Sequence, residues 1–230
     1  MDHWQSRAGN TRHGVACRFL KGSGLEIGGL HGPIRVPTID RVANVDRMTL
    51  EGLRQHYPEL AGTDLTPVDI VDDGEALATV PDDSQDFVIA SHVIEHCENP
   101  LLAIRNWLRV TKNGSYIMIV VPDKRFTFDS ERPVTPWHHV LRDYTEGPDW
   151  SRWSHYEEVV RSQGKWTPLT EDQATWARQL MTERHSIHFH VWEPQDFLEF
   201  LVMAKRIGLP FELAQFSQNG EEFIAILQRA

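Results

Sequence analysis

Short apolar runs alternate with helix-like stretches along most of the chain, and no other feature of the sequence limits the fold as strongly. Such alternation is typical of a parallel sheet that is covered by helices on both faces. The expected strands span residues 24–28, 43–47, 66–71, 87–91 and 115–121. A helix is expected to start at Pro100, because Asn99 suits its N-cap position. We therefore predict an α/β fold with a doubly wound, mostly parallel sheet.

The C-terminal end of the chain departs from the parallel pattern. A helix is expected from Pro194, and two strand-like runs follow it at residues 210–216 and 222–227. Asn219 and Gly220 lie between these runs, and Asn-Gly is the strongest short hairpin signal because a type I′ turn needs positive φ at both central residues. The sheet is thus predicted to have seven strands and to end in an antiparallel hairpin.

The stretch between Pro122 and His190 does not follow the alternation. Thr170 and Gln173 form a capping box that predicts the start of a helix within it. Compact domains rarely carry connections of this length without a functional reason. We expect a single domain over residues 1–230, in which residues 123–190 form a helical insertion that serves as a lid or substrate-binding segment. Its tryptophans, which could stack on a substrate or pack against the core, are Trp137, Trp150, Trp153, Trp166 and Trp176.

Charge and cysteine content narrow the classes of function. The net charge of −10 disfavours a nucleic acid as partner, because proteins that bind nucleic acids usually present a basic face. Cys17 and Cys97 match neither a disulfide framework nor a zinc knuckle, so free thiols in a reducing compartment are expected. Residues 1–21 are polar, and no apolar run is long enough to span a bilayer. We expect a cytoplasmic protein without membrane contact, and we allow for a homodimer.

A glycine-rich turn follows the first expected strand. Glu26 lies at the end of the strand, and Gly28 and Gly29 let the backbone approach a ligand closely. About 20 residues after the first strand, Asp46 ends the second one, next to Arg47, at a position where acids bind ribose hydroxyls in nucleotide-binding sheets. This pair suits a nicotinamide cofactor as well as others. However, the dinucleotide fingerprint, in which G-x-G-x-x-G runs straight into a helix, is broken here.

A second series of motifs runs from the third expected strand to Pro100. It consists of an acid pair before Gly74, the P-D-D-S-Q-D turn at residues 81–86 and the H-V-I-E-H sequence at residues 92–96. In this order, and over roughly residues 24–123, the motifs resemble the type 11 methyltransferase family. The resemblance implies a class I, Rossmann-like methyltransferase that uses S-adenosylmethionine (SAM). Members of this family often occur among sugar- and glycan-modifying enzymes.

The resemblance places the cofactor in the turns that follow the strands. Its implied contacts are Glu26 and Gly28 at the methionine end, Asp46 at the ribose hydroxyls, Asp73 and Gly74 at the adenine, and Ser91 and His92 beside the cofactor, with Gly29 and Arg47 adjoining them. Extra residues separate Asp69 from the P-D-D-S-Q-D turn, so the choice among Asp69, Asp72 and Asp73 stays open.

Methyl transfer itself requires mainly alignment, because the sulfonium group is already an activated donor. A base is needed only for an acceptor that arrives protonated, and a histidine serves that purpose near neutral pH. The alternation of residues 186–192 predicts that His188 and His190 share a face turned toward the pocket. Each histidine could instead only hydrogen-bond loop backbone. The catalytic candidates are His92, His96, His139, His188 and His190.

His92, Glu95 and His96 also suggest a metal site, as an alternative to a metal-free enzyme. On a loop that enters a helix these side chains can lie close together and, with His188 or His190, could bind a divalent ion. Some related RNA and quinone O-methyltransferases use E-x-x-E-H and a distal histidine in this way. Here His92 replaces the first acid, and the competing interpretation is that Glu95 and His96 only brace the loop.

The sequence therefore predicts a SAM-dependent methyltransferase. The expected acceptor is an oxygen or nitrogen atom of a small polar metabolite, such as a sugar, a nucleotide sugar or a natural-product intermediate. The alternatives are a metal-assisted O-methyltransferase, an NAD-dependent oxidoreductase and a binding module without turnover.

Overall fold

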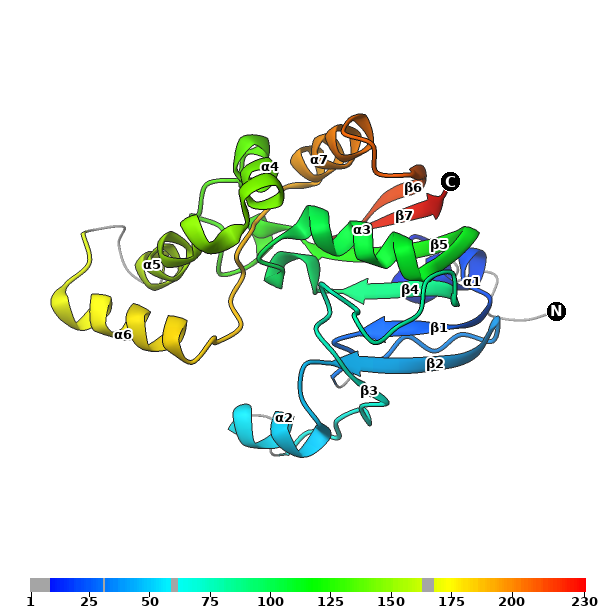
Figure 1. The fold of residues 1–230 in the computed structure, drawn as a ribbon, viewed down its shortest axis with the longest axis horizontal. Coiled ribbons are helices and arrows are strands. Elements are labelled where there is room, and N and C mark those ends of the chain that lie inside the picture. The colour runs from blue at the N-terminus through cyan, green and yellow to red at the C-terminus, as the bar shows by residue number, and fades with distance from the viewer. Residues whose placement is uncertain (1–8, 31, 59–61, 163–167) are drawn as a thin grey trace.

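The computed structural model describes residues 9–30, 32–58, 62–162 and 168–230. Within them, seven strands form one sheet in the order β3-β2-β1-β4-β5-β7-β6 (Figure 1). Neighbouring strands among β1 to β5 pair in parallel, and β7 pairs antiparallel with both β5 and β6. The strands are β1 (Gly22–Ile27), β2 (Ile39–Asp46), β3 (Ile70–Val71), β4 (Gln85–Ser91), β5 (Thr111–Pro122), β6 (Phe211–Asn219) and β7 (Glu222–Arg229). The predicted sheet and its terminal hairpin are confirmed.

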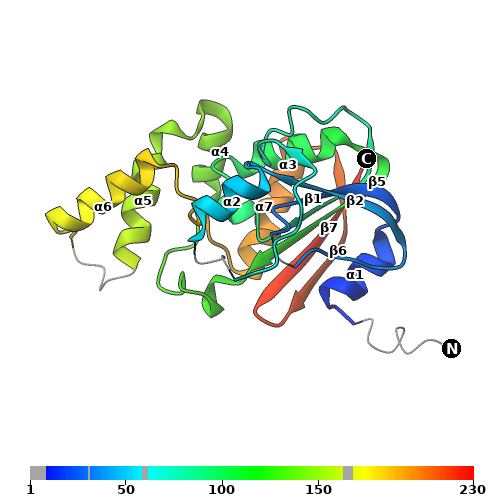
Figure 2. The same ribbon diagram turned by 90° about the horizontal axis from the view of Figure 1, so that it is seen from below.

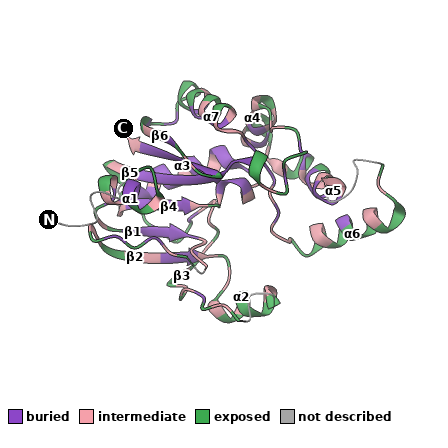
Figure 3. Ribbon diagram, turned by 180° about the vertical axis from the view of Figure 1, so that it is seen from behind, coloured by how far each residue is buried: buried purple, intermediate pink, exposed green. Residues whose placement is uncertain are grey.

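Helices and a loop cover the two faces of the sheet with separate cores. One core joins the sheet to α3 (Pro100–Val110), α4 (Trp137–Glu146) and α7 (Pro194–Arg206). The other core joins the opposite face to α1 (Arg12–Phe19) and to Ile34 and Val36. Figure 3 shows the central strands buried between these layers.

The helix α1 was missed by the sequence analysis, which began the alternation at residue 24. Thr11 caps this helix by accepting a hydrogen bond from the Gly14 amide at 3.1 Å. Only Val15, Ala16 and the following Leu20 carry apolar bulk into the core, so the segment reads as polar. It nevertheless covers a face of the sheet.

The connection from β1 to β2 has no helix in its described residues. Ile34 and Val36 are buried in an irregular segment and shield the sheet there. Proline fixes φ and lacks an amide donor, so Pro33 and Pro37 prevent a regular helix at this place. His31, in the glycine-rich turn, lies outside the described residues.

The third strand is shorter than predicted, because only Ile70 and Val71 pair with β2 rather than all of residues 66–71. Pro67 cannot donate to a ladder, and β3 lies at the edge of the sheet, where pairing is available on one side alone.

Residues 123–190 contain α4, α5 (Arg152–Ser162) and α6 (Glu171–Thr182). The capping box at Thr170 is confirmed. Tyr156, Val160 and Ala177 form a small core between α5 and α6, and both helices extend away from the sheet (Figures 1 and 2). The remaining helix, α2 (Leu50–His56), follows β2. No helix in the described ranges is long and apolar enough to cross a membrane.

Candidate active site

A cleft of about 640 Å³ opens at the carboxyl ends of β1, β2 and β4. Its other walls are α2 and residues 184–189, the segment that follows α6. Ligands of open α/β sheets bind at this edge, and the volume falls within the range of small-molecule sites. The topology therefore directs attention to the side chains that end these strands.

Gly28 and Asp46 lie side by side in the cleft, as the sequence predicted. Gly28 has a φ of +62°, which favours glycine, and its amide donates to the Val45 carbonyl at 2.9 Å. Burial raises the pKa of the Asp46 carboxyl, although the amides of Arg47 and Met48 oppose the shift by hydrogen bonding. A desolvated carboxylate with fixed backbone partners is ready to accept hydrogen bonds from a ligand.

The turn that follows β3 forms another wall. The Gly74 carbonyl accepts a hydrogen bond from the Trp107 indole at 2.7 Å, and a Cβ at Gly74 would lie 2.7 Å from Cγ2 of Ile27. Asp72 accepts hydrogen bonds from the amide and the hydroxyl of Thr79, each at 2.7 Å. The turn is therefore rigid and brings its backbone close to the cleft.

The three acids near this turn have different roles. Asp69 lies outside the cleft, where its carboxylate accepts the Asn44 amide at 2.8 Å and braces β2. Asp72 and Asp73 both line the cleft. Because Asp72 is engaged by the Thr79 hydrogen bonds, Asp73 is the better candidate for a ligand contact.

Glu26 does not line the cleft, contrary to the sequence prediction. Both of its carboxylate oxygens lie 3.0 Å from the Ile34 amide, and Arg35 donates to one of them at 3.1 Å. Burial raises the pKa of Glu26 to about 7, although these hydrogen bonds oppose the shift. The physical reason is the missing helix after β1, since the carboxylate fixes the loop that replaces it.

Gly29 and Ser91 also lie outside the residues that line the cleft. A Cβ at Gly29 would lie 3.1 Å from Oδ1 of Asn44, so this glycine serves close packing. The Ser91 hydroxyl, at the end of β4, is buried without a hydrogen-bond partner among the described residues. An unpaired hydroxyl beside a cleft is consistent with a polar ligand.

His92 reaches the cleft directly after β4. Its φ of +54° is rare for a non-glycine residue and is found most often at functional sites. Its Nε2 lies 2.8 Å from Oε2 of Glu222, whose other oxygen accepts from Nε of Arg12 at 2.8 Å. Burial opposes ionisation of Glu222, but hydrogen bonds from Arg12 and His92 outweigh it and lower the pKa of Glu222 to about 2. A carboxylate therefore orients the His92 ring.

His96 lies deeper in the same wall. Its Nδ1 is 2.9 Å from the Ile187 carbonyl, which can only accept, so Nδ1 carries the hydrogen and Nε2 bears a lone pair. Burial, followed by the nearby His188, lowers the pKa of His96 to about 3. The imidazole is neutral at physiological pH, but it is a weak base.

Glu95 and His188 meet His96 beneath the cleft. Glu95 is 1% exposed, and neither of its carboxylate oxygens has a hydrogen-bond partner among the described residues. Burial raises the pKa of Glu95 to about 8. One potential ligand atom from each of these three residues lies within 4.8 Å of the others. The alternative metal group is therefore corrected, because His92 pairs with Glu222 and His188 takes its place.

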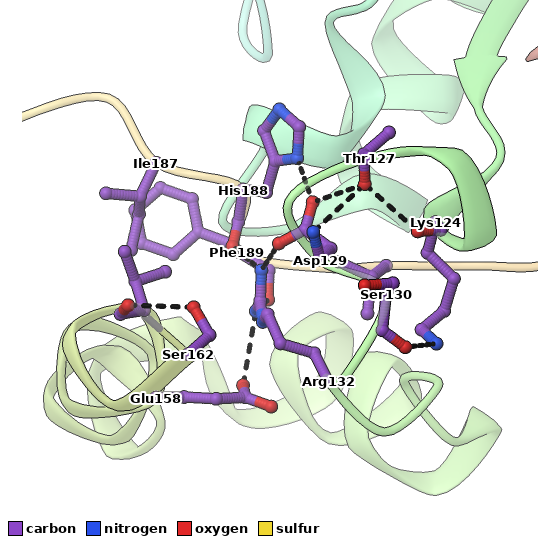
Figure 4. A network of polar contacts seen from close by, with 12 residues as sticks. Lys124, Thr127, Asp129, Ser130, Arg132, Glu158, Ser162, Ile187, His188 and Phe189 are labelled. Carbon is purple, nitrogen blue, oxygen red and sulfur yellow. Dashed lines mark hydrogen bonds and ion pairs between the residues drawn. The ribbon is translucent and has the colours of Figure 1, made fainter. Parts of the chain in front are cut away.

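A buried ionic network continues from His188 (Figure 4). Nδ1 of His188 lies 2.6 Å from Oδ2 of Asp129, and Arg132 donates to Oδ1 of the same carboxylate at 2.7 Å. Arg132 is 1% exposed and also donates to Glu158 on α5 at 3.2 Å and to the His188 carbonyl at 2.9 Å. The network ties α5 to residues 184–189, which form a wall of the cleft.

His139, His188 and His190 lie outside the cleft, which corrects their predicted direction. Phe189 occupies the cleft side of the extended segment, and successive side chains of such a segment point to opposite sides. His188 therefore turns to Asp129, and His190 packs against His139 with ring centres 5.5 Å apart.

Other cleft residues were not predicted as site residues. Arg47, which was predicted, donates to the Arg184 carbonyl and to the Tyr57 hydroxyl, each at 3.0 Å, and so joins α2 to the segment after α6. Arg184, His185, Tyr57 and Tyr156 line the cleft. No spacing motif marks them, because they come from distant parts of the chain.

The predicted tryptophans pack rather than line the cleft. Trp137 packs against the main core and Trp153 against the core of α5 and α6. Trp150 and Trp176 are each 40% exposed. Trp166 lies outside the described residues.

The sheet order, the terminal hairpin and the cleft at the carboxyl edge define a class I methyltransferase fold. The profile of the family described as "Methyltransferase domain" matches residues 6–198. The chain belongs to this family and is a SAM-dependent methyltransferase, which decides the choice of cofactor against NAD. No protein with a curated function matches the sequence.

Solved structures share this fold at low sequence identity. The PH0226 protein of Pyrococcus horikoshii is 17% identical, with a TM-score of 0.51, and the match covers 100% of this chain and 93% of that chain. A SAM-dependent methyltransferase of Thermotoga maritima is 15% identical, with a TM-score of 0.50, and the match covers 94% of this chain and 86% of that chain. These likenesses bear on the fold alone.

The residues present fit the cofactor. Gly28 and Gly74 allow close approach of a ligand to the backbone, and the Asp46 carboxylate and the unpaired Ser91 hydroxyl offer it polar partners. The bound cofactor supplies a methyl group on a sulfonium, which is already activated for transfer.

Proposed function

We propose that the enzyme transfers the methyl group of SAM to an oxygen or nitrogen atom of a small polar metabolite, such as a sugar, a nucleotide sugar or a natural-product intermediate. The observation that carries this proposal is the size of the cleft, since about 640 Å³ must hold the cofactor and the acceptor together. The net charge of −10 argues against a nucleic acid as acceptor. Free Cys17 and Cys97 suit a cytoplasmic location.

The cofactor is proposed to lie along the strand ends. Asp46 would accept hydrogen bonds from the ribose hydroxyls, while Asp73 and Gly74 would contact the adenine. Gly28 would let the methionine end pass close to the backbone. All four line the cleft in this order from β1 to the turn after β3.

The acceptor is proposed to bind between α2 and residues 184–189. Arg47, Arg184 and His185 give this part of the cleft hydrogen-bond donors, and Tyr57 and Tyr156 add hydroxyl groups. Guanidinium groups bind carboxylate and phosphate well, so an acceptor with an anionic group fits this end.

His92 is proposed as the general base for a protonated acceptor. Glu222 binds its Nε2 and orients the ring, which leaves Nδ1 to take the proton from a hydroxyl or an ammonium group. The side chain is 42% exposed, so an acceptor can reach it. His96, whose pKa is about 3, is a poorer proton acceptor.

The test is release of S-adenosylhomocysteine (SAH) from SAM across a panel of sugars, nucleotide sugars, amines and phenols. With an acceptor found, His92→Gln should lower kcat by roughly 10²–10⁴-fold. His138→Gln, at an exposed histidine on α4, should leave kcat unchanged. Equal kcat in both variants would remove His92 as the base, and turnover on RNA alone would refute the small-molecule acceptor.

A metal-assisted O-methyltransferase is a second candidate, favoured by the two unpaired Glu95 oxygens beside His96 and His188. A divalent ion there would pair the buried carboxylate and could bind an acceptor hydroxyl. This candidate predicts loss of turnover in chelator, recovery with Mg²⁺ or Mn²⁺, and no recovery in Glu95→Gln. Full turnover in chelator would exclude it.

A further inference from the structure

Four side chains with metal-binding groups converge behind the cleft. His139 and Asp143 lie one turn apart on α4, His155 lies on α5, and His190 lies just before α7. One potential ligand atom from each lies within 4.8 Å of all the others. The group therefore joins three segments that are distant in sequence.

The distances within this group match a tetrahedral site. Nε2 of His139 lies 3.0 Å from Nε2 of His155 and 3.3 Å from Oδ2 of Asp143. Nε2 of His190 lies 3.7 Å from the same oxygen. Zinc bonds of about 2.0–2.1 Å in a tetrahedron place neighbouring donor atoms about 3.3 Å apart.

Burial and unpaired atoms point to a missing partner for this group. Asp143 and His190 are fully buried and His155 nearly so, while the His139 side chain is 17% exposed. Oδ1 of Asp143 accepts from the Ser151 hydroxyl at 2.9 Å, which fixes the carboxylate. Oδ2 of Asp143 and Nδ1 of His190 have no hydrogen-bond partner among the described residues. Buried polar atoms are seldom left in this state.

We propose that His139, Asp143, His155 and His190 bind one Zn²⁺ ion that holds α4, α5 and the segment before α7 together. Three imidazoles and one carboxylate suit zinc, whereas Ca²⁺ and Mg²⁺ prefer oxygen ligands. Four protein ligands leave no open position, so the site is structural rather than catalytic. Phe189, next to His190, lines the cleft, so the ion also steadies a cleft wall.

The charge states of the four side chains agree with this assignment. Burial lowers the pKa of His139 to about 4 and that of His155 to about 3, so both imidazoles are neutral, which is the form that binds a metal. Burial also raises the pKa of Asp143 to about 6, and a cation would stabilise its anion. The ring of Trp150 packs on His139 with centres 4.8 Å apart and shields it from solvent.

The experiment is zinc titration of the full-length protein after removal of metal with dipicolinate. Metal content is measured by mass spectrometry and affinity by calorimetry. His139→Gln and His155→Gln should each remove one zinc equivalent and weaken zinc binding by more than about 100-fold, because even the loss of an outer-shell partner costs 10–100-fold. His138→Gln, at the exposed neighbour on α4, is the matched control and should bind zinc like the wild type.

Two further readouts guard against variants that fail to fold and against the Glu95 group. Wild-type protein loaded with Co²⁺ should show the intense visible bands of tetrahedral cobalt, and its Tm should rise with added zinc. Glu95→Gln should retain the zinc. Failure of the wild type to bind zinc, an octahedral cobalt spectrum, or loss of the zinc in Glu95→Gln with retention in His139→Gln would each overturn the proposal.

Discussion

The cleft edge of the sheet and residues 123–190 are stabilised in different ways. At the cleft edge, single polar side chains such as Asp46 follow apolar strands, and the backbone is fixed by turns and glycine. In residues 123–190, charged side chains are themselves buried, as with Arg132 and Asp143. The first arrangement leaves polar groups free for a ligand, whereas the second uses them to hold helices together.

The histidines show what this difference teaches. His92 and His96 line the cleft, while His190 faces His139 and His155 on the other side of the same wall. Identical side chains thus contribute to ligand binding on one side and to cohesion on the other. Burial and partners, rather than residue type, decide which role each has.

The largest expected effect tests the buried network. Arg132→Met should lower the free energy of unfolding by roughly 3–5 kcal/mol, because it leaves the buried Asp129 carboxylate without its guanidinium partner. Lys205→Met, which breaks the exposed pair with Glu212, is the control and should cost less than about 1 kcal/mol. Urea unfolding measures both variants, and equal losses would erase the distinction between the two regions.

The next effect tests Glu26, the buried carboxyl on the cleft side. Its pKa is about 7 in the folded protein and near 4.5 in the unfolded chain, so the folded state retains a proton between these values. Its contribution to stability is therefore present below about pH 4.5 and is lost as the pH rises through 7, by about 3 kcal/mol at 1.36 kcal/mol per pKa unit.

Glu26→Gln removes this titration. The stability of the variant relative to the wild type should therefore rise between about pH 5 and about pH 8, as measured by urea unfolding at each pH. A difference that does not change with pH would show that Glu26 is ionised throughout this range.

The smallest effect concerns the turn after β3. Asn106 donates to the Glu75 carbonyl at 2.9 Å and holds this turn against α3. Asn106→Ala should cost about 1 kcal/mol of stability and weaken SAH binding by a few fold. Arg105→Ala, at the exposed neighbouring position, should change neither quantity. If SAH binds equally well to both variants, the turn does not depend on this hydrogen bond for its shape in the bound state.

The sequence predicted the sheet because its signals are local. The apolar runs and the Asn219-Gly220 turn each report on a few neighbouring residues, and together they define the order of strands. The helix α1 was missed because it buries few apolar side chains, and β3 was overestimated because Pro67 cannot pair. Both errors concern elements with weak local signals.

The site was predictable only where strand ends carry it. Gly28 and Asp46 lie in the cleft because parallel strands end at one edge. The alternation around His188 and His190 gave their relative direction, but it could not tell which side of the segment would face the cleft. Arg184 and His185 reach the cleft through the packing of α5 and α6, which no short sequence window contains.

The most direct test of the account is calorimetric titration of SAH into the wild type, Asp46→Ala and Asp40→Ala. Asp40 is an exposed acid on the same strand and controls for the loss of charge. The account predicts that Asp46→Ala loses about 1.5–3 kcal/mol of binding free energy, which is roughly a 10–150-fold loss of affinity, and that Asp40→Ala binds like the wild type. Equal affinity in all three proteins would contradict the assignment of Asp46 to the cofactor.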